Sequence, residues 1–118
     1  MSKATDGRWP HILSPFALGA LELPNRTVVA PMTRISADPE GVPTAQMAAH
    51  YSEFARGGFG LIITEGTYTD LAQSQGYRDQ PGIVTPAQVE GWRQVVESVH
   101  DAGGRIVLQL MHAGALVQ

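Results

Sequence analysis

Apolar residues follow two different patterns along this chain. Short continuous apolar runs occupy about residues 27–30, 60–64 and 105–110, as in strands that are buried on both faces of a parallel sheet. Apolar residues recur at three- and four-residue steps over about 45–56 and 86–102, which predicts two amphipathic helices. The order strand, helix, strand, helix, strand favours an α/β fold with right-handed crossovers and a parallel sheet.

Local signals mark the ends of both predicted helices. Thr44 can cap the first helix, and a glycine pair at 57–58 can end it, because glycine adopts the left-handed conformation at little cost. Thr85 is the N-cap of the second helix, Pro86 takes its first position, and Gln88 completes a capping box. The predicted buried faces consist of Met47, Ala48, Tyr51, Phe54 and Ala55 in the first helix and of Val89, Trp92, Val95, Val96 and Val99 in the second.

Turn signals define the remaining segments. Gly19 and Ala20 separate two short apolar runs within about residues 12–24, which predicts a small hairpin. Residues 38–41 have the composition of a turn. Residues 65–84 contain no periodic pattern and predict a long loop, and a loop of that length in a compact domain is usually functional.

Composition excludes several classes of protein. The 118 residues are 43% hydrophobic and 16% charged, as in a soluble globular protein, and a net charge of −3 without a basic run argues against nucleic-acid binding. No cysteine is present, which excludes disulfides, thiolate metal sites and cysteine nucleophiles. His11, His50 and His100 lack metal-ligand spacing, so we expect no metal. Without a signal peptide or a membrane-spanning run we expect a cytoplasmic protein with no membrane contact.

Polar and small residues lie at the C-terminal end of each predicted strand of the sheet. They lie at Ala30–Thr33, Thr64–Thr67 and Gln109–His112. The C-terminal ends of parallel strands meet along one edge, where α/β proteins place their chemistry. Within the second group, Glu65 is expected to hold a basic neighbour, with Arg34 as the candidate. The three groups therefore form a site hypothesis.

Each of these residues, taken alone, also has an ordinary structural explanation. Thr33 could cap a turn, Gly66 could be a simple turn residue, and the Gln109 amide could bond loop backbone groups. A lone histidine beside a strand end, such as His112, is more often structural than a ligand or an acid.

Taken in order, longer segments resemble a known family. Asn25–Arg34, Arg56–Thr67 and Gln109–Gly114, with shorter matches between them, resemble the Old Yellow Enzyme family of FMN-dependent NADH:flavin oxidoreductases, or ene-reductases. The resemblance covers nearly the whole chain after residue 11. It implies a TIM (β/α)8 barrel, of which residues 1–118 are the N-terminal segment of one FMN-binding domain with the hairpin, three barrel strands and two helices.

The resemblance also implies an activity and cofactor contacts. NADH or NADPH would deliver hydride to FMN, which passes it to an activated C=C bond of a small-molecule alkene. Thr33 would bond the flavin C4 carbonyl and tune its potential, Gly66 would allow close approach of the ring, and Gln109 would pair with the pyrimidine edge. The full set of implied flavin contacts is Ala30, Pro31, Met32, Thr33, Gly66 and Gln109.

Some parts of the family pattern are missing. Ala115 stands where many relatives carry a flavin-facing arginine, and the substrate-binding pair, the proton donor and the phosphate-binding loops have no counterpart here. We therefore expect no catalytic residue in this segment and no activity from it alone. A partial barrel leaves sheet edges unpaired, so we expect it to need the remaining barrel or another chain. The alternative is a non-catalytic half-barrel fragment that does not bind flavin by itself; a barrel enzyme of other chemistry is a further alternative.

Overall fold

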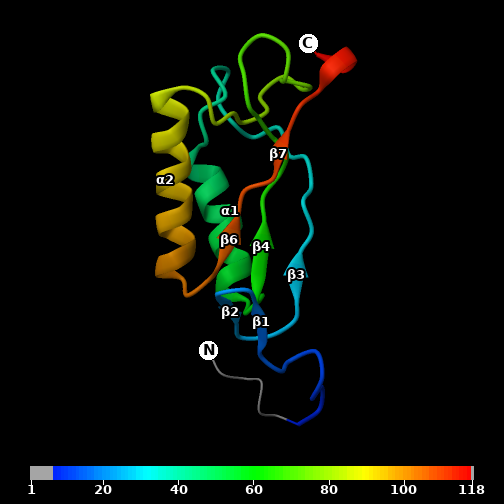
Figure 1. Ribbon diagram of the computed structural model, residues 1–118. Helices are drawn as coiled ribbons and strands as arrows, with labels where there is room; N and C mark the ends of the chain where they lie inside the picture. The colour runs from blue at the N-terminus through cyan, green and yellow to red at the C-terminus, as the bar shows by residue number, and fades with distance from the viewer. Residues whose placement is uncertain (1–6, 118) are drawn as a thin grey trace.

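A computed structural model describes residues 7–117 of the chain. Residues 1–6 and 118, which belong to the predicted N-terminal segment, lie outside the described residues. A hairpin lies at one end of the molecule, a small sheet with two helices at its centre, and a set of loops at the other end (Figure 1). In chain order the elements are β1 (Phe16–Leu18), β2 (Leu21–Leu23), β3 (Val28–Val29), α1 (Ala45–Arg56), β4 (Leu61–Ile63), β5 (Thr67–Tyr68), α2 (Pro86–Asp101), β6 (Ile106–Val107), β7 (Leu110–Met111) and a 3₁₀ turn (Gly114–Leu116).

The central sheet is parallel, with the strand order β3-β4-β6. Val29 pairs with Ile62 on β4, and Ile62 pairs with Ile106 on β6. A helix connects each strand to the next, as predicted. β1 and β2 form the predicted antiparallel hairpin, with Leu18 opposite Leu21.

The prediction of one continuous strand over 105–110 is wrong. β6 ends at Val107, and the chain then pairs through β7 with β5, not with β4. The break covers Leu108 and Gln109, and the backbone N–H of Gln109 donates to the side-chain hydroxyl of Thr64 (3.1 Å). The Thr64 hydroxyl therefore takes the place of a backbone acceptor on β4, and the chain beyond this point pairs with β5. The loop predicted over 65–84 is likewise not free of secondary structure, since it contains β5.

Both helices form at the predicted positions. The Thr44 hydroxyl accepts from the backbone N–H of Met47, and Thr85 and Gln88 form the predicted capping box. Gly58 (φ 97°) and Gly103 (φ 84°) take the left-handed conformation where each helix ends. This conformation costs glycine little and other residues more.

The main core lies between the two helices and one face of the sheet. Gln88 occupies the inward position in the first turn of α2, where its amide bonds Tyr68 and the backbone of Glu40. The adjacent Val89 consequently points outward and is 43% exposed, so its predicted place in the core is wrong. The buried core residues are Val29, Ala37, Met47, Tyr51, Ala55, Ile62, Trp92, Val95 and Val99.

The opposite face of the sheet is largely uncovered. α1 and α2 lie on the same side of the sheet (Figure 1). Val28 on β3 is 44% exposed and Val107 on β6 is 39% exposed. The prediction that the strands are buried on both faces holds for β4, where the successive residues Leu61 and Ile62 are both buried. It is wrong for β3 and β6, whose Val28 and Val107 are exposed on the side away from the helices.

Candidate functional site

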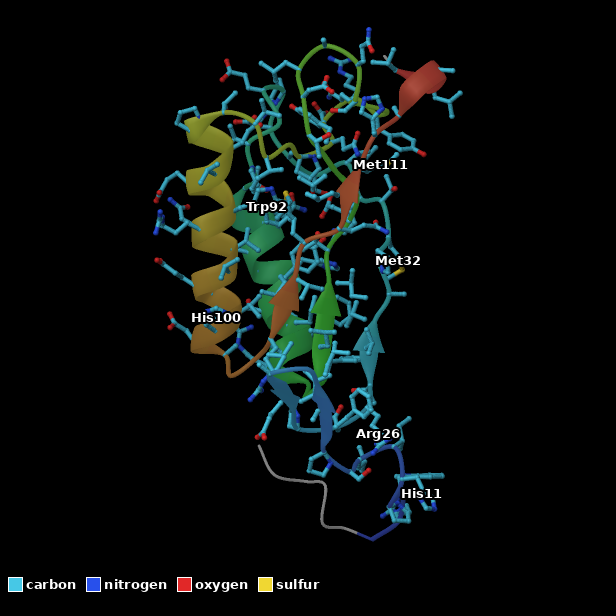
Figure 2. The ribbon with its side chains drawn as sticks, in the orientation of Figure 1. His11, Arg26, Met32, Trp92, His100 and Met111 are labelled. Atoms are coloured by element: carbon cyan, nitrogen blue, oxygen red, sulfur yellow. The ribbon has the colours of Figure 1, made fainter. Side chains whose placement is uncertain are left out.

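The strand ends form one continuous edge, here called the rim. β3, β4 and β6 are parallel neighbours, so the segments that follow them leave the sheet on the same side. Met32 and Met111, which come from two of these segments, both lie beyond the sheet toward the loop end of the molecule (Figure 2). The segments after β4 and β6 are joined directly, since Thr67 N–H donates to the Gln109 carbonyl (2.9 Å).

Two polar side chains at the rim have no hydrogen-bond partner among the residues that the structure describes. Thr33 and Gln109 are exposed, and within residues 7–117 neither the Thr33 hydroxyl nor the Gln109 amide makes a hydrogen bond to another residue. Together they offer a hydroxyl, an amide donor and an amide acceptor. This donor set suits the edge of a flat heterocycle that carries both carbonyl and N–H groups. Ala30 and Met32 are also exposed, and Pro31 is half-buried.

Gly66 is buried, unlike Thr33 and Gln109. A Cβ placed on Gly66 would lie 2.5 Å from Met111 Sδ and 3.1 Å from Met111 Cβ. The Gly66 carbonyl accepts a hydrogen bond from Gln80 Nε2 (2.8 Å). In this structure the glycine thus makes room for Met111, and its expected place against a ring stays a prediction.

We expect Gly66→Ala to lower the free energy of unfolding by about 1–3 kcal/mol, as overpacking of a core does. The added methyl group would overlap Met111, whose Cβ belongs to a strand and cannot move freely. Urea denaturation measures the loss. Adding Met111→Ala to the same chain should restore much of it; a double variant no more stable than Gly66→Ala would exclude Met111 as the cause.

A buried pair lies directly beneath the rim. Glu65 is 1% exposed, and its Oε2 accepts a hydrogen bond from the Tyr51 hydroxyl at 2.5 Å. No ion pair between Glu65 and the predicted partner Arg34 is formed among the described residues; Glu65 Oε1 and Arg34 Nη1 are both buried without a hydrogen-bond partner. Sequence periodicity placed Tyr51 in the core, but it could not reveal the partner of its hydroxyl.

Burial governs the titration of this pair. Burial raises the pKa of Tyr51, so the hydroxyl stays protonated and can donate. Burial also raises the pKa of Glu65 above its ordinary value of 4.5, while the Tyr51 hydrogen bond and the positive charge of Arg34 act in the opposite direction. The folded state therefore holds the Glu65 proton more tightly than the unfolded state does, and this contribution to stability is lost as the pH rises above 4.5 toward the folded pKa.

We expect Glu65→Gln to reduce the loss of stability that occurs between about pH 4 and about pH 7, because glutamine does not ionise. Denaturation curves at both pH values measure the difference. Glu53→Gln, on the exposed side of α1, is the matched control and should follow the parent. A parental pH dependence in Glu65→Gln would show that Glu65 does not titrate abnormally.

Buried polar side chains order the loop between β5 and α2. The Ser74 hydroxyl accepts from the backbone N–H groups of Thr69 (2.9 Å) and Asp70 (2.8 Å). Gln80 Oε1 accepts from Gly76 N–H (2.8 Å), while its amide reaches Gly66. Serine and glutamine are common in exposed loops, so the burial of Ser74 and Gln80 could not be predicted from their residue types.

His112 makes structural contacts. Its Nε2 lies 3.4 Å from Asp70 Oδ2, and its Nδ1 accepts from Gly114 N–H (3.0 Å). Across residues 7–117 no group of three or more side chains converges as metal ligands would. In the same part of the chain, the helices are too short or too polar to cross a bilayer.

Comparison with known proteins identifies the chain. Residues 11–118 match the family of NADH:flavin oxidoreductases and NADH oxidases. A probable flavin mononucleotide-dependent alkene reductase of Leishmania infantum is 43% identical over 87% of this chain and 27% of its own length. A putative 12-oxophytodienoate reductase 2 of Oryza sativa subsp. japonica is 42% identical over the same shares.

Solved structures agree with these sequence matches. Morphinone reductase in complex with tetrahydroNAD superposes with a TM-score of 0.82 at 44% identity, over 92% of this chain and 29% of its own. The old yellow enzyme homologue from Zymomonas mobilis gives 0.82 at 41%, over 92% and 30%. The chain thus spans less than a third of these relatives, which are (β/α)8 barrels. Members of the matched family use FMN with NADH or NADPH. The chain belongs to the NADH:flavin oxidoreductase / NADH oxidase family, and its fold is an N-terminal part of that family's barrel.

Proposed function

We propose that this chain forms part of the FMN site of an ene-reductase. The chemistry that bound FMN would supply is hydride transfer from NADH or NADPH to an activated C=C bond. The observation that carries the proposal is a pair of polar side chains, Thr33 and Gln109, on a rim shared by parallel strands. Neither has a hydrogen-bond partner in the described part of the chain. Family membership adds independent support.

Each rim residue has a proposed task. The segment Ala30–Met32, of which Ala30 and Met32 are exposed, would lie beside the ring. Thr33 would donate a hydrogen bond to the C4 carbonyl, and Gln109 would offer both a donor and an acceptor to the pyrimidine edge. Gly66 keeps the second strand end free of a side chain. These groups bind and orient the flavin; substrate binding and protonation are left to residues outside this chain.

The uncovered face of the sheet indicates which part of the fold would complete the site. Val28 and Val107 expose apolar surface there, which costs free energy in water. We propose that the remaining barrel strands, of the kind found in the relatives, cover this face. A small activated alkene would then bind above the rim between the two parts.

Fusion to a relative tests the proposal. The completed barrel would consist of this chain followed by the part of morphinone reductase that continues beyond the matched segment. We expect a yellow protein that couples oxidation of NADH or NADPH to reduction of an activated alkene. Intact morphinone reductase is the control. A folded but colourless completed barrel would favour the alternative of a non-catalytic fragment.

In the completed barrel, we expect Thr33→Ala to lower the midpoint potential of the bound flavin. A hydroxyl that donates to the ring carbonyl stabilises negative charge on the ring, and alanine removes that donor. Spectroscopic redox titration measures the potential. Thr33→Ser keeps the hydroxyl and should stay near the parent; equal potentials in parent and Thr33→Ala would remove the assignment.

A further inference from the structure

Tyr51 and Glu65 connect the middle of α1 to the end of β4 through two hydrogen bonds. The Tyr51 hydroxyl donates to Glu65 Oε2 (2.5 Å) and accepts from the backbone N–H of Glu65 (2.9 Å). Both side chains are almost completely buried. The two bonds fix the side chain and the backbone of Glu65 together, since one hydroxyl serves both.

The same hydrogen-bond network continues to the rim. The Glu65 carbonyl accepts from the hydroxyls of Thr64 (2.9 Å) and Thr67 (3.0 Å). Thr64 Oγ1 in turn accepts from Gln109 N–H (3.1 Å), and Thr67 N–H donates to the Gln109 carbonyl (2.9 Å). Both backbone polar groups of Gln109 are thus held by residues that bond directly to Glu65.

We propose that Tyr51 and Glu65 are positioning residues for the flavin: their buried pair fixes the 64–67 segment, and through it the backbone that presents the Gln109 amide at the rim. This inference rests on the proposed function. Neither residue touches the ring in this scheme, because both lie below the rim and are closed off from solvent. Arg34 lies near enough for its charge to act on Glu65, and it directly follows Thr33 in the chain.

A purely structural pair would behave differently from a positioning pair. Removing a purely structural pair would lower the stability of the whole protein. Its effect on flavin affinity would add to the effect of removing the Gln109 amide. A positioning pair acts through Gln109, so its effect on flavin affinity should largely disappear once the Gln109 amide is gone. A double-mutant cycle on flavin affinity therefore separates the two.

The experiment compares variants of the completed barrel by titration of the apoprotein with FMN. We expect Tyr51→Phe to weaken binding about tenfold, as expected when one buried hydrogen bond is lost, and to change the visible absorption spectrum of the bound flavin. Tyr68→Phe is the matched control: it removes a buried hydroxyl that bonds Gln88 and not Glu65. That variant should keep the parental affinity and spectrum. The Tyr51→Phe/Gln109→Ala double variant should bind FMN about as well as Gln109→Ala alone.

Glu65 variants supply a second measurement that does not depend on Tyr51→Phe. Glu65→Gln keeps an acceptor for the Tyr51 hydroxyl and should stay close to the parental spectrum, whereas Glu65→Leu should resemble Tyr51→Phe. Parental affinity in Tyr51→Phe, or full additivity with Gln109→Ala, would overturn the positioning role while leaving the flavin site intact. A completed barrel that folds without binding FMN would overturn the proposed function, and this inference with it.

Discussion

Trp92→Ala is expected to lower the free energy of unfolding by about 3–5 kcal/mol, the usual cost of truncating a buried aromatic side chain. Trp92 is 4% exposed and lies in the core between α2 and the sheet. Its ring is 6.5 Å from that of Tyr51, centroid to centroid, and its Nε1 donates to the Gly82 carbonyl (3.0 Å). Alanine would leave both a cavity and a buried carbonyl without its partner.

Urea denaturation of the completed barrel measures this loss. Val89→Ala lies one turn earlier on the same helix and serves as the control, since Val89 is largely outside the core. It should change stability by no more than about 0.5 kcal/mol, as most surface substitutions do. Equal stabilities for the two variants would mean that α2 packs on the sheet through a different face.

Gln109→Ala is expected to weaken FMN binding by about ten- to a hundredfold, because the amide is proposed to make two hydrogen bonds to the flavin. The protein itself should be little affected, since the exposed side chain has no hydrogen-bond partner within the described residues. Fluorescence titration with FMN measures the affinity. Gln94→Ala, which removes an exposed glutamine from α2, is the matched control and should bind like the parent. Unchanged affinity in Gln109→Ala would exclude Gln109 from the cofactor site.

The helices and their caps were predictable because their causes are local. Thr85, Pro86 and Gln88 act within one turn of chain, and the left-handed glycines at 58 and 103 end the helices without help from distant residues. The rim was predictable for a similar reason. Once strands alternate with helices, the sheet is parallel and its C-terminal ends must share an edge.

The errors have long-range causes. The break between β6 and β7 depends on a hydrogen bond from Gln109 to Thr64, which are 45 residues apart. Gln88, and not Val89, faces the core, because the Gln88 amide donates hydrogen bonds to the Glu40 carbonyl and the Tyr68 hydroxyl. Neither contact can be predicted from the local spacing of apolar residues.

The candidate site was therefore only partly accessible from sequence. The resemblance predicted that Thr33 and Gln109 contact the flavin, and this stays a prediction. The structure places both on the rim as exposed side chains without a hydrogen-bond partner among residues 7–117. The resemblance did not identify the pair formed by Tyr51 and Glu65, because a tyrosine on an apolar helix face is ordinarily explained by packing alone. Arg34 was predicted as the partner of Glu65 because its charge is opposite. In the structure the Glu65 carboxylate instead accepts a hydrogen bond from the Tyr51 hydroxyl.

The position of the flavin relative to the rim is the most direct test of this account. A crystal structure of the FMN-loaded completed barrel should place the Thr33 hydroxyl and the Gln109 amide within hydrogen-bond distance of the same isoalloxazine ring, with Gly66 beside it. A ring bound elsewhere in the barrel, or one that contacts neither Thr33 nor Gln109, would contradict the proposed site.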